Sequence, residues 1–132
     1  MAKKIRIGIL THNYPVNSKE RKDAGVFIDD FAHQLAKSAK VFVFCPDFGG
    51  KKEKYKDVPV TWFKWNSTSE KFGDWSLFDP YSLVKFLRLT SAGKKAVLNF
   101  VENNKIDFCL AVWAFPSGYF ALEAKRKLGI PY

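Results

Sequence analysis

Residues that can take part in binding chemistry gather in two short segments, each directly after a strongly apolar stretch. The first stretch ends at Thr11 and the second at Val112. The segments that follow contain His12, Asn13, Tyr14, Trp113, Ser117 and Gly118. An imidazole can accept a proton, amides and hydroxyls can hydrogen-bond a ligand, and an indole can stack on a sugar ring. If the two stretches are neighbouring parallel strands, these segments meet at one sheet edge and form a crevice.

Most of these residues also allow a structural interpretation. His12 is a candidate general base or ligand contact, although the sequence shows no obvious carboxylate partner for it. Trp113 suits core packing at a strand end as well as it suits stacking on a ligand. Asn13 and Tyr14 can contact a ligand or shape the loop. Gly118 can face a ligand or let the following helix pack closely on the sheet.

The composition describes one globular domain with a basic surface. The chain has 132 residues, of which 47% are hydrophobic, and a net charge of +9. Such a charge attracts nucleic acid, anionic lipid or phosphorylated substrates. No long apolar run or secretory leader is visible, so we expect a cytoplasmic protein. Cys45 and Cys109 lie in predicted strands, far apart, so we expect buried thiols and no metal or cofactor.

The pattern of apolar residues predicts alternating strands and helices. Strands are predicted at Ile5–Thr11, Lys40–Pro46, Val58–Trp65 and Ile106–Val112. Helices are predicted at Val26–Ser38, from Asp79-Pro80 to Asn104 with a break at Thr90–Gly93, and from a Ser117 cap to Gly129. This order indicates an α/β fold, a Rossmann-like three-layer sandwich with a mainly parallel sheet and strand order 3-2-1-4.

The first predicted helix has an apolar stripe that we expect to face the core. The stripe consists of Phe27, Ile28, Phe31, Ala32 and Leu35, with Asp29, Asp30, Gln34 and Lys37 expected in solvent. His33 follows Asp29 by four residues, which predicts a surface ion pair. Gly25 precedes the helix and fits either a turn or a close phosphate contact at the helix N-terminus.

A segment rich in aromatic and basic residues precedes the second predicted helix. It contains Trp62, Phe63, Lys64, Trp65, Lys71, Phe72, Trp75 and Phe78. Such segments suit a membrane interface, a lipid-linked acceptor or single-stranded nucleic acid. The alternative is packing against the helix, which we expect for most of the aromatic rings, with one or two exposed.

These segments together resemble the opening of glycosyltransferase family 4, which has the GT-B fold. The similar segments are 10–15, 23–28, 35–36, 41–46, 107–118 and 128–132, which span nearly the whole chain in order. Trp-Ala-Phe-Pro-Ser-Gly at 113–118 and Leu-Gly-Ile-Pro-Tyr at 128–132 are the most specific. The sequence departs from the family at Leu110 and Val112, where many members have histidine, and at Ala24, where a second glycine is usual.

The resemblance implies the acceptor-binding N-terminal domain of a retaining sugar transferase that requires no metal. By the resemblance, Gly25 would lie near the donor diphosphate. The resemblance assigns no catalytic residue in this chain, and His12 is the candidate only through its place in the crevice. The acceptor side would comprise Trp113, Ser117 and Gly118, and we add Asn13 and Tyr14 as acceptor contacts from their place in the crevice. The expected partners are a nucleotide-sugar, a glycan or lipid-linked acceptor and, through the basic and aromatic surface, a membrane.

The resemblance also predicts that the chain ends before a fifth strand and lacks the donor domain, so that alone it would be inactive. The strand at 106–112 would then be an apolar edge open to pairing with another chain. The alternative function is a non-catalytic α/β module that binds a phosphorylated metabolite in the same crevice. Charge alone suggests nucleic acid, and without a recognised motif we expect no specific binding to it.

Overall fold

A computed structural model of the chain describes residues 2–16, 25–49, 52, 58–65, 76 and 78–132. Its strands are β1 (Arg6–Leu10), β2 (Lys40–Pro46), β3 (Val60–Phe63) and β4 (Phe108–Ala111). Its helices are α1 (Val26–Leu35), α2 (Pro80–Asn104) and α3 (Tyr119–Leu128), with a wide turn, η3 (Ala114–Gly118), before α3. The predicted elements are all present, with ends that differ by a few residues.

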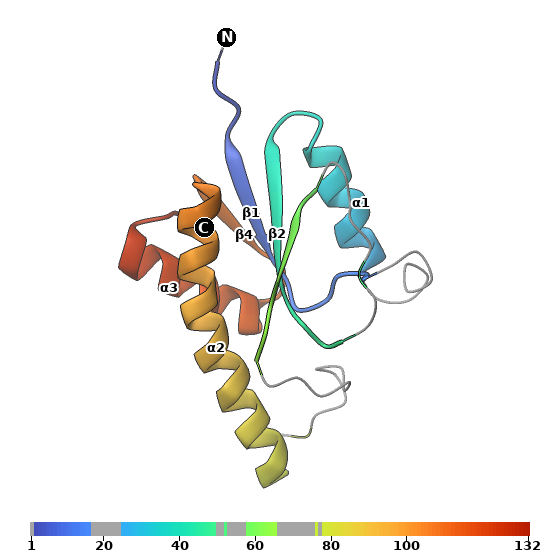
Figure 1. Cartoon of the computed structure of the whole chain (residues 1–132), viewed down its shortest axis with the longest axis vertical. Helices are drawn as coiled ribbons and strands as arrows, with labels where there is room; N and C mark the ends of the chain where they lie inside the picture. The colour runs from blue at the N-terminus through green and yellow to red at the C-terminus, as the bar shows by residue number, and fades with distance from the viewer. Residues whose placement is uncertain (1, 17–24, 50–51, 53–57, 66–75, 77) are drawn as a thin grey trace.

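The four strands form one parallel sheet in the order β3-β2-β1-β4, as predicted. β1 lies between β2 and β4, so that Ile9 pairs with Val43 on one side and Leu110 on the other. α1 covers one face of the sheet, and α2 and α3 cover the other (Figure 1). The chain is therefore an α/β protein with a Rossmann-like, three-layer arrangement.

Each face of the sheet buries its own apolar cluster, because side chains alternate along a strand. Ile9 packs toward α1, whereas Leu10 and Phe44 pack toward α2 and α3. Phe44 lies at the centre of the second cluster. Its ring stacks on Phe63 with centroids 4.7 Å apart and meets Phe120 edge-on at 6.1 Å. The aromatic residues of β2 and β3 thus fasten the sheet to the helical layer.

α2 is one continuous helix, which corrects the predicted break at Thr90–Gly93. The Thr90 hydroxyl donates to the carbonyl of Phe86 at 3.0 Å, so it is satisfied inside the helix. A Cβ atom on Gly93 would lie 2.1 Å from the Phe120 ring. The glycine therefore marks a close contact between α2 and α3 and not a helix end.

α1 is rotated relative to the predicted stripe. Ile28 and Ala32 are buried as expected, but Phe27 and Phe31 are 59% and 46% exposed. Asp29, which was predicted to face solvent, is 1% exposed. The periodicity of apolar residues could not predict the burial of Asp29, because the carboxylate accepts a hydrogen bond from a residue in another segment, as described below.

The end of the chain differs from the prediction in two ways. Gly129 ends α3 in the left-handed region with φ 72, as predicted, but Ser117 does not cap α3 and lies buried in η3. The Cys109 amide donates to the Pro131 carbonyl at 2.9 Å. The residues after α3 therefore return beside the outer edge of β4, which we had expected to be fully open, and pair with it at this point.

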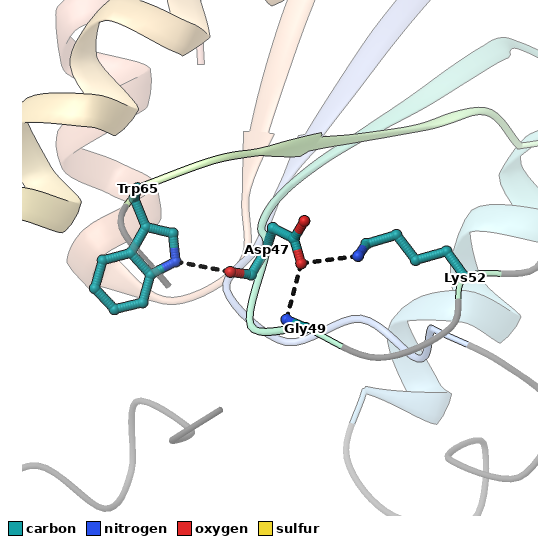
Figure 2. Close-up of polar contacts among 4 residues, drawn as sticks. All are labelled: Asp47, Gly49, Lys52 and Trp65. Atoms are coloured by element: carbon teal, nitrogen blue, oxygen red, sulfur yellow. Dashed lines mark hydrogen bonds and ion pairs between the residues drawn. The ribbon is translucent and has the colours of Figure 1, made fainter. Parts of the chain in front are cut away.

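The aromatic segment divides between the core and the surface. Phe63 and Trp65 are buried and Phe78 is 98% exposed, whereas Phe72 and Trp75 lie outside the described residues. The Trp65 indole donates to the Asp47 carbonyl at 3.0 Å (Figure 2). The Asp47 carboxylate in turn accepts from the Gly49 amide and the Lys52 ammonium, both at 2.8 Å.

These contacts fix the loop after β2 to the end of β3. Partial burial raises the pKa of the Asp47 carboxyl, but the hydrogen bonds from Lys52 and Gly49 outweigh burial, so the pKa lies below its usual value. The Asp47 carboxylate is therefore ionised at neutral pH. Through the Asp47 carbonyl, the same loop holds the Trp65 ring in one orientation beside α2.

Replacing Gly93 with alanine should destabilise the protein although alanine is the better helix former. The added methyl group meets Phe120, and we expect a net loss of about 1–2 kcal/mol of unfolding free energy. Urea denaturation measures the loss, with Ser91→Ala on the exposed face of the same helix as the control. A Gly93→Ala protein at least as stable as the unsubstituted protein would contradict the close contact.

Candidate functional site

The two loops predicted to form a crevice do meet at the carboxyl ends of β1 and β4. Leu10 pairs with Ala111, and the Val112 amide continues the ladder by donating to the Leu10 carbonyl at 2.9 Å. His12 and Trp113 follow directly. Their ring centroids lie 5.6 Å apart at an interplanar angle of 44°. Strand pairing alone therefore brings together two side chains that are about a hundred residues apart in sequence.

Trp113 is held in a strained backbone conformation. Its φ of 81 and ψ of 135 lie in a region that residues with a side chain rarely adopt. Such a conformation costs about 1–3 kcal/mol and is found mainly at functional sites. The indole is 48% exposed and meets the Phe27 ring edge-on at 6.3 Å. Trp113 is thus not a core residue, which resolves one alternative that the sequence left open.

The next residues turn the chain into α3. Phe115 has extended dihedrals inside η3, and the peptide bond between it and Pro116 is cis. The Phe115 ring stacks on Phe86 of α2 with centroids 4.7 Å apart and an interplanar angle of 11°. The loop that carries Trp113 is therefore packed against the N-terminal half of α2.

His12 is partly buried beside Trp113. Burial lowers the pKa of the imidazole below its ordinary value of 6.5, because the charged form loses hydration. His12 is therefore neutral at neutral pH. A neutral imidazole has one nitrogen that can accept a proton or a hydrogen bond, which is the form that a general base or a contact for a sugar hydroxyl needs.

Gly25 is positioned by the loop after β1. It precedes α1 with φ 84, and a Cβ atom there would lie 2.6 Å from the Asn13 carbonyl oxygen. Its own carbonyl accepts from the amides of Ile28 and Asp29. These contacts account for a glycine at this position through a tight turn, which was one of its two predicted roles. The diphosphate contact stays a proposal.

Asn13 and Tyr14 have different surroundings. The Thr11 hydroxyl accepts from the Asn13 amide at 3.1 Å, which shapes the loop, and Asn13 itself is partly exposed. Tyr14 is only 5% exposed and packs in the cluster beneath α1. Its position matches the predicted role in shaping the loop, and its ring is not presented in the crevice.

Ser117 and Gly118 lie at the base of the Trp113 loop. Ser117 is buried, and the Gly118 amide donates to the Trp113 carbonyl at 3.3 Å. A Cβ atom on Gly118 would have a single described neighbour within 4 Å, the Trp113 carbonyl oxygen at 3.8 Å, and φ is −62. Neither the backbone nor the packing against the sheet therefore requires glycine here, in contrast to Gly25 and Gly93.

A buried polar cluster joins the loop after β1 to α1, and most of it has no signal in the sequence. The Tyr14 hydroxyl donates to Asp29 Oδ1 at 2.6 Å, and His33 Nδ1 lies 3.0 Å from the same oxygen. The spacing of Asp29 and His33 predicted their pairing, but as a surface pair. Only the Tyr14 contact, which joins the loop to α1, explains why the carboxylate is buried.

Thiol and metal chemistry find no support among the described residues. Cys45 and Cys109 are buried free thiols, as predicted. Burial raises the pKa of both, to about 11 for Cys109, so both are protonated at neutral pH. Within the described ranges, no three His, Cys, Asp or Glu side chains gather as metal ligands would. No helix among them is long and apolar enough to cross a membrane.

Comparison of the sequence with known protein families and with curated proteins gives no match. A proposal for the function must therefore be argued from the fold and from the geometry of the crevice.

The strain at Trp113 can be measured with two substitutions that both remove the indole. Trp113→Gly relieves the backbone and Trp113→Ala does not, so we expect the glycine variant to be more stable by about 1 kcal/mol. Urea denaturation of both proteins checks this. At an unstrained position the order would be reversed, and equal stabilities would contradict a strained Trp113.

The Tyr14–Asp29 contact should matter for stability. Tyr14→Phe leaves the ring in place but removes a buried donor to the carboxylate, and we expect a loss of about 1–2 kcal/mol. The control is Tyr81→Phe, since the Tyr81 side chain is exposed, and this variant should unfold at an unchanged denaturant concentration. Equal effects of the two substitutions would show that the hydrogen bond contributes nothing.

Proposed function

We propose that this chain is the acceptor-binding half of a retaining glycosyltransferase with the GT-B fold. In this proposal a sugar moves from a nucleotide-sugar to a glycan or lipid-linked acceptor. The observation that carries it is Trp113, a half-exposed indole held by a strained backbone opposite a neutral histidine. An aromatic face with a few polar groups beside it suits a sugar, whose C–H groups stack on the ring while its hydroxyls are hydrogen-bonded.

The residues of the crevice would divide the work as follows. The Trp113 indole would stack on the acceptor sugar, and the neutral imidazole of His12 would accept a hydrogen bond from an acceptor hydroxyl. In this proposal the acceptor would lie beside Gly118, where a Cβ atom would meet only the Trp113 carbonyl oxygen among the described atoms within 4 Å. The donor diphosphate would approach the positive end of α1, near Gly25. In this proposal the domain that binds the nucleotide-sugar is not formed by these 132 residues.

The acceptor role is tested by titrating the isotope-labelled chain with a panel of methyl glycosides and disaccharides. We expect at least one saccharide to shift the Trp113 indole N–H signal in NMR spectra with saturation. Trp113→Ala should weaken that binding by about tenfold or more, equivalent to about 1.4 kcal/mol. Trp62→Phe is the matched control, because it removes an indole outside the crevice and should leave the affinity unchanged.

Two results would count against the proposal. If none of the saccharides binds, the crevice is not an acceptor site. If only sugar phosphates bind, with an affinity that falls steeply as salt is raised, the alternative of a module for phosphorylated metabolites replaces it. Free nucleotide-sugars should bind this chain more weakly than the saccharide, since the proposal assigns the donor to another domain.

A further inference from the structure

A second surface of the molecule exposes apolar side chains together with positive charge. α2 extends beyond the carboxyl ends of the strands, and its first turns lie past the end of the sheet (Figure 1). Among the described residues, five of the eleven exposed large hydrophobic side chains belong to this short stretch. They are Phe78 (98% exposed), Tyr81 (66%), Leu83 (51%), Val84 (45%) and Leu87 (58%).

The helical part of this stretch has one buried side and one exposed side. Ser82, Lys85 and Leu89 recur at intervals of three and four and are buried on the side that faces the protein. Leu83, Val84 and Leu87 are therefore on the other side, where a helix of a soluble protein normally carries charged residues. Large apolar side chains at such positions indicate a surface that contacts something apolar.

The charges along all but the last turn of this helix have the same sign. Between Pro80 and Val101 the sequence contains four basic residues and no acidic residue, and the first acidic residue is Glu102. Arg88 and Lys95 are exposed, and both border a groove of about 500 Å³. The other walls of the groove include Val84, Leu87 and the ring of Trp65, whose indole N–H is held by the Asp47 carbonyl.

We propose that the N-terminal half of α2 docks on an anionic lipid surface. Leu83, Val84 and Leu87 would enter the boundary between headgroups and acyl chains, and Arg88 and Lys95 would contact lipid phosphates. The absence of acidic residues between Pro80 and Val101 favours a negatively charged lipid surface over a typical protein partner, whose surface presents both signs of charge. The net charge of +9 adds a longer-range attraction.

The position of this surface connects it with the crevice. Phe86 lies within the docking stretch and stacks on Phe115, in the loop that carries Trp113. A protein held on a bilayer through α2 would therefore keep the crevice close to the headgroups. The docking proposal does not depend on sugar transfer, because it rests on exposure and charge outside the crevice.

The experiment is co-sedimentation of the chain with vesicles of phosphatidylcholine alone or mixed equally with phosphatidylglycerol. We expect binding to the mixed vesicles and little to the neutral ones. Leu83→Ser/Leu87→Ser should reduce binding by about tenfold or more through lost apolar contact. Arg88→Gln/Lys95→Gln should reduce it by about tenfold to thirtyfold on the mixed vesicles.

Matched controls separate this surface from general stickiness and general charge. Ile5→Ser/Phe31→Ser removes two apolar side chains of similar exposure elsewhere, and Arg126→Gln/Lys127→Gln removes two exposed cations from α3. Both should retain most of the binding, and circular dichroism should show that every variant is folded.

Three results would overturn the proposal. One is an absence of binding to the mixed vesicles, and another is an equal loss in the α3 charge variant, which would show that net charge alone drives binding. The third is a dimer that dissociates on Leu83→Ser/Leu87→Ser in sedimentation equilibrium without lipid, since the covered face would then belong to a second copy. The saccharide titration is independent of all three, so failure of one proposal is distinguishable from failure of the other.

Discussion

Most of this fold follows from the pairing of β1 with strands on both of its sides. β1 donates and accepts backbone hydrogen bonds along both edges, so its side chains can only point into one helical layer or the other. Gly8 sits where a Cβ atom would lie 2.9 Å from the Phe100 ring, which lets α2 approach the sheet closely. The same pairing carries the chain past Leu10 and Ala111 in parallel and leaves His12 beside Trp113. The layers of the core and the crevice are thus two consequences of one arrangement of strands.

A single buried polar contact then decides which residues surround that crevice. The Tyr14 hydroxyl compensates the Asp29 carboxylate, which allows α1 to turn a polar residue inward and two phenylalanines outward. Phe27 thereby reaches the edge of the Trp113 indole. Trp113 itself has a strained backbone, and the loop that follows it is packed on α2 through the stacking of Phe115 on Phe86. The strained backbone that presents the Trp113 indole beside His12 must therefore be compensated by stabilising contacts elsewhere in the fold, as is usual for residues at binding sites.

α2 shows how one helix can serve two different environments. Its C-terminal half is packed on the sheet and on α3, with Gly93 at the closest contact with Phe120. Its N-terminal half continues past the sheet with Leu83 and Leu87 exposed and Arg88 beside them. Asp79 caps this end of the helix, because its carboxylate accepts hydrogen bonds from the backbone amides of Tyr81 and Ser82. These hydrogen bonds lower the pKa of the Asp79 carboxyl. The first turns of α2 therefore present apolar side chains that do not pack in the core of this domain.

The amino-acid sequence alone predicts the number and order of the strands and helices, the parallel sheet, the cap at Asp79 and the stop at Gly129. These follow from short-range periodicity and from the conformational limits of individual residues, which act over a few positions. It also placed His12 and Trp113 at one edge, because parallel strands share a polarity. Tertiary contacts are what bury Asp29, require glycine at position 93 and leave Trp113 strained and exposed. Each of these depends on a partner distant in sequence, whose presence no local pattern records.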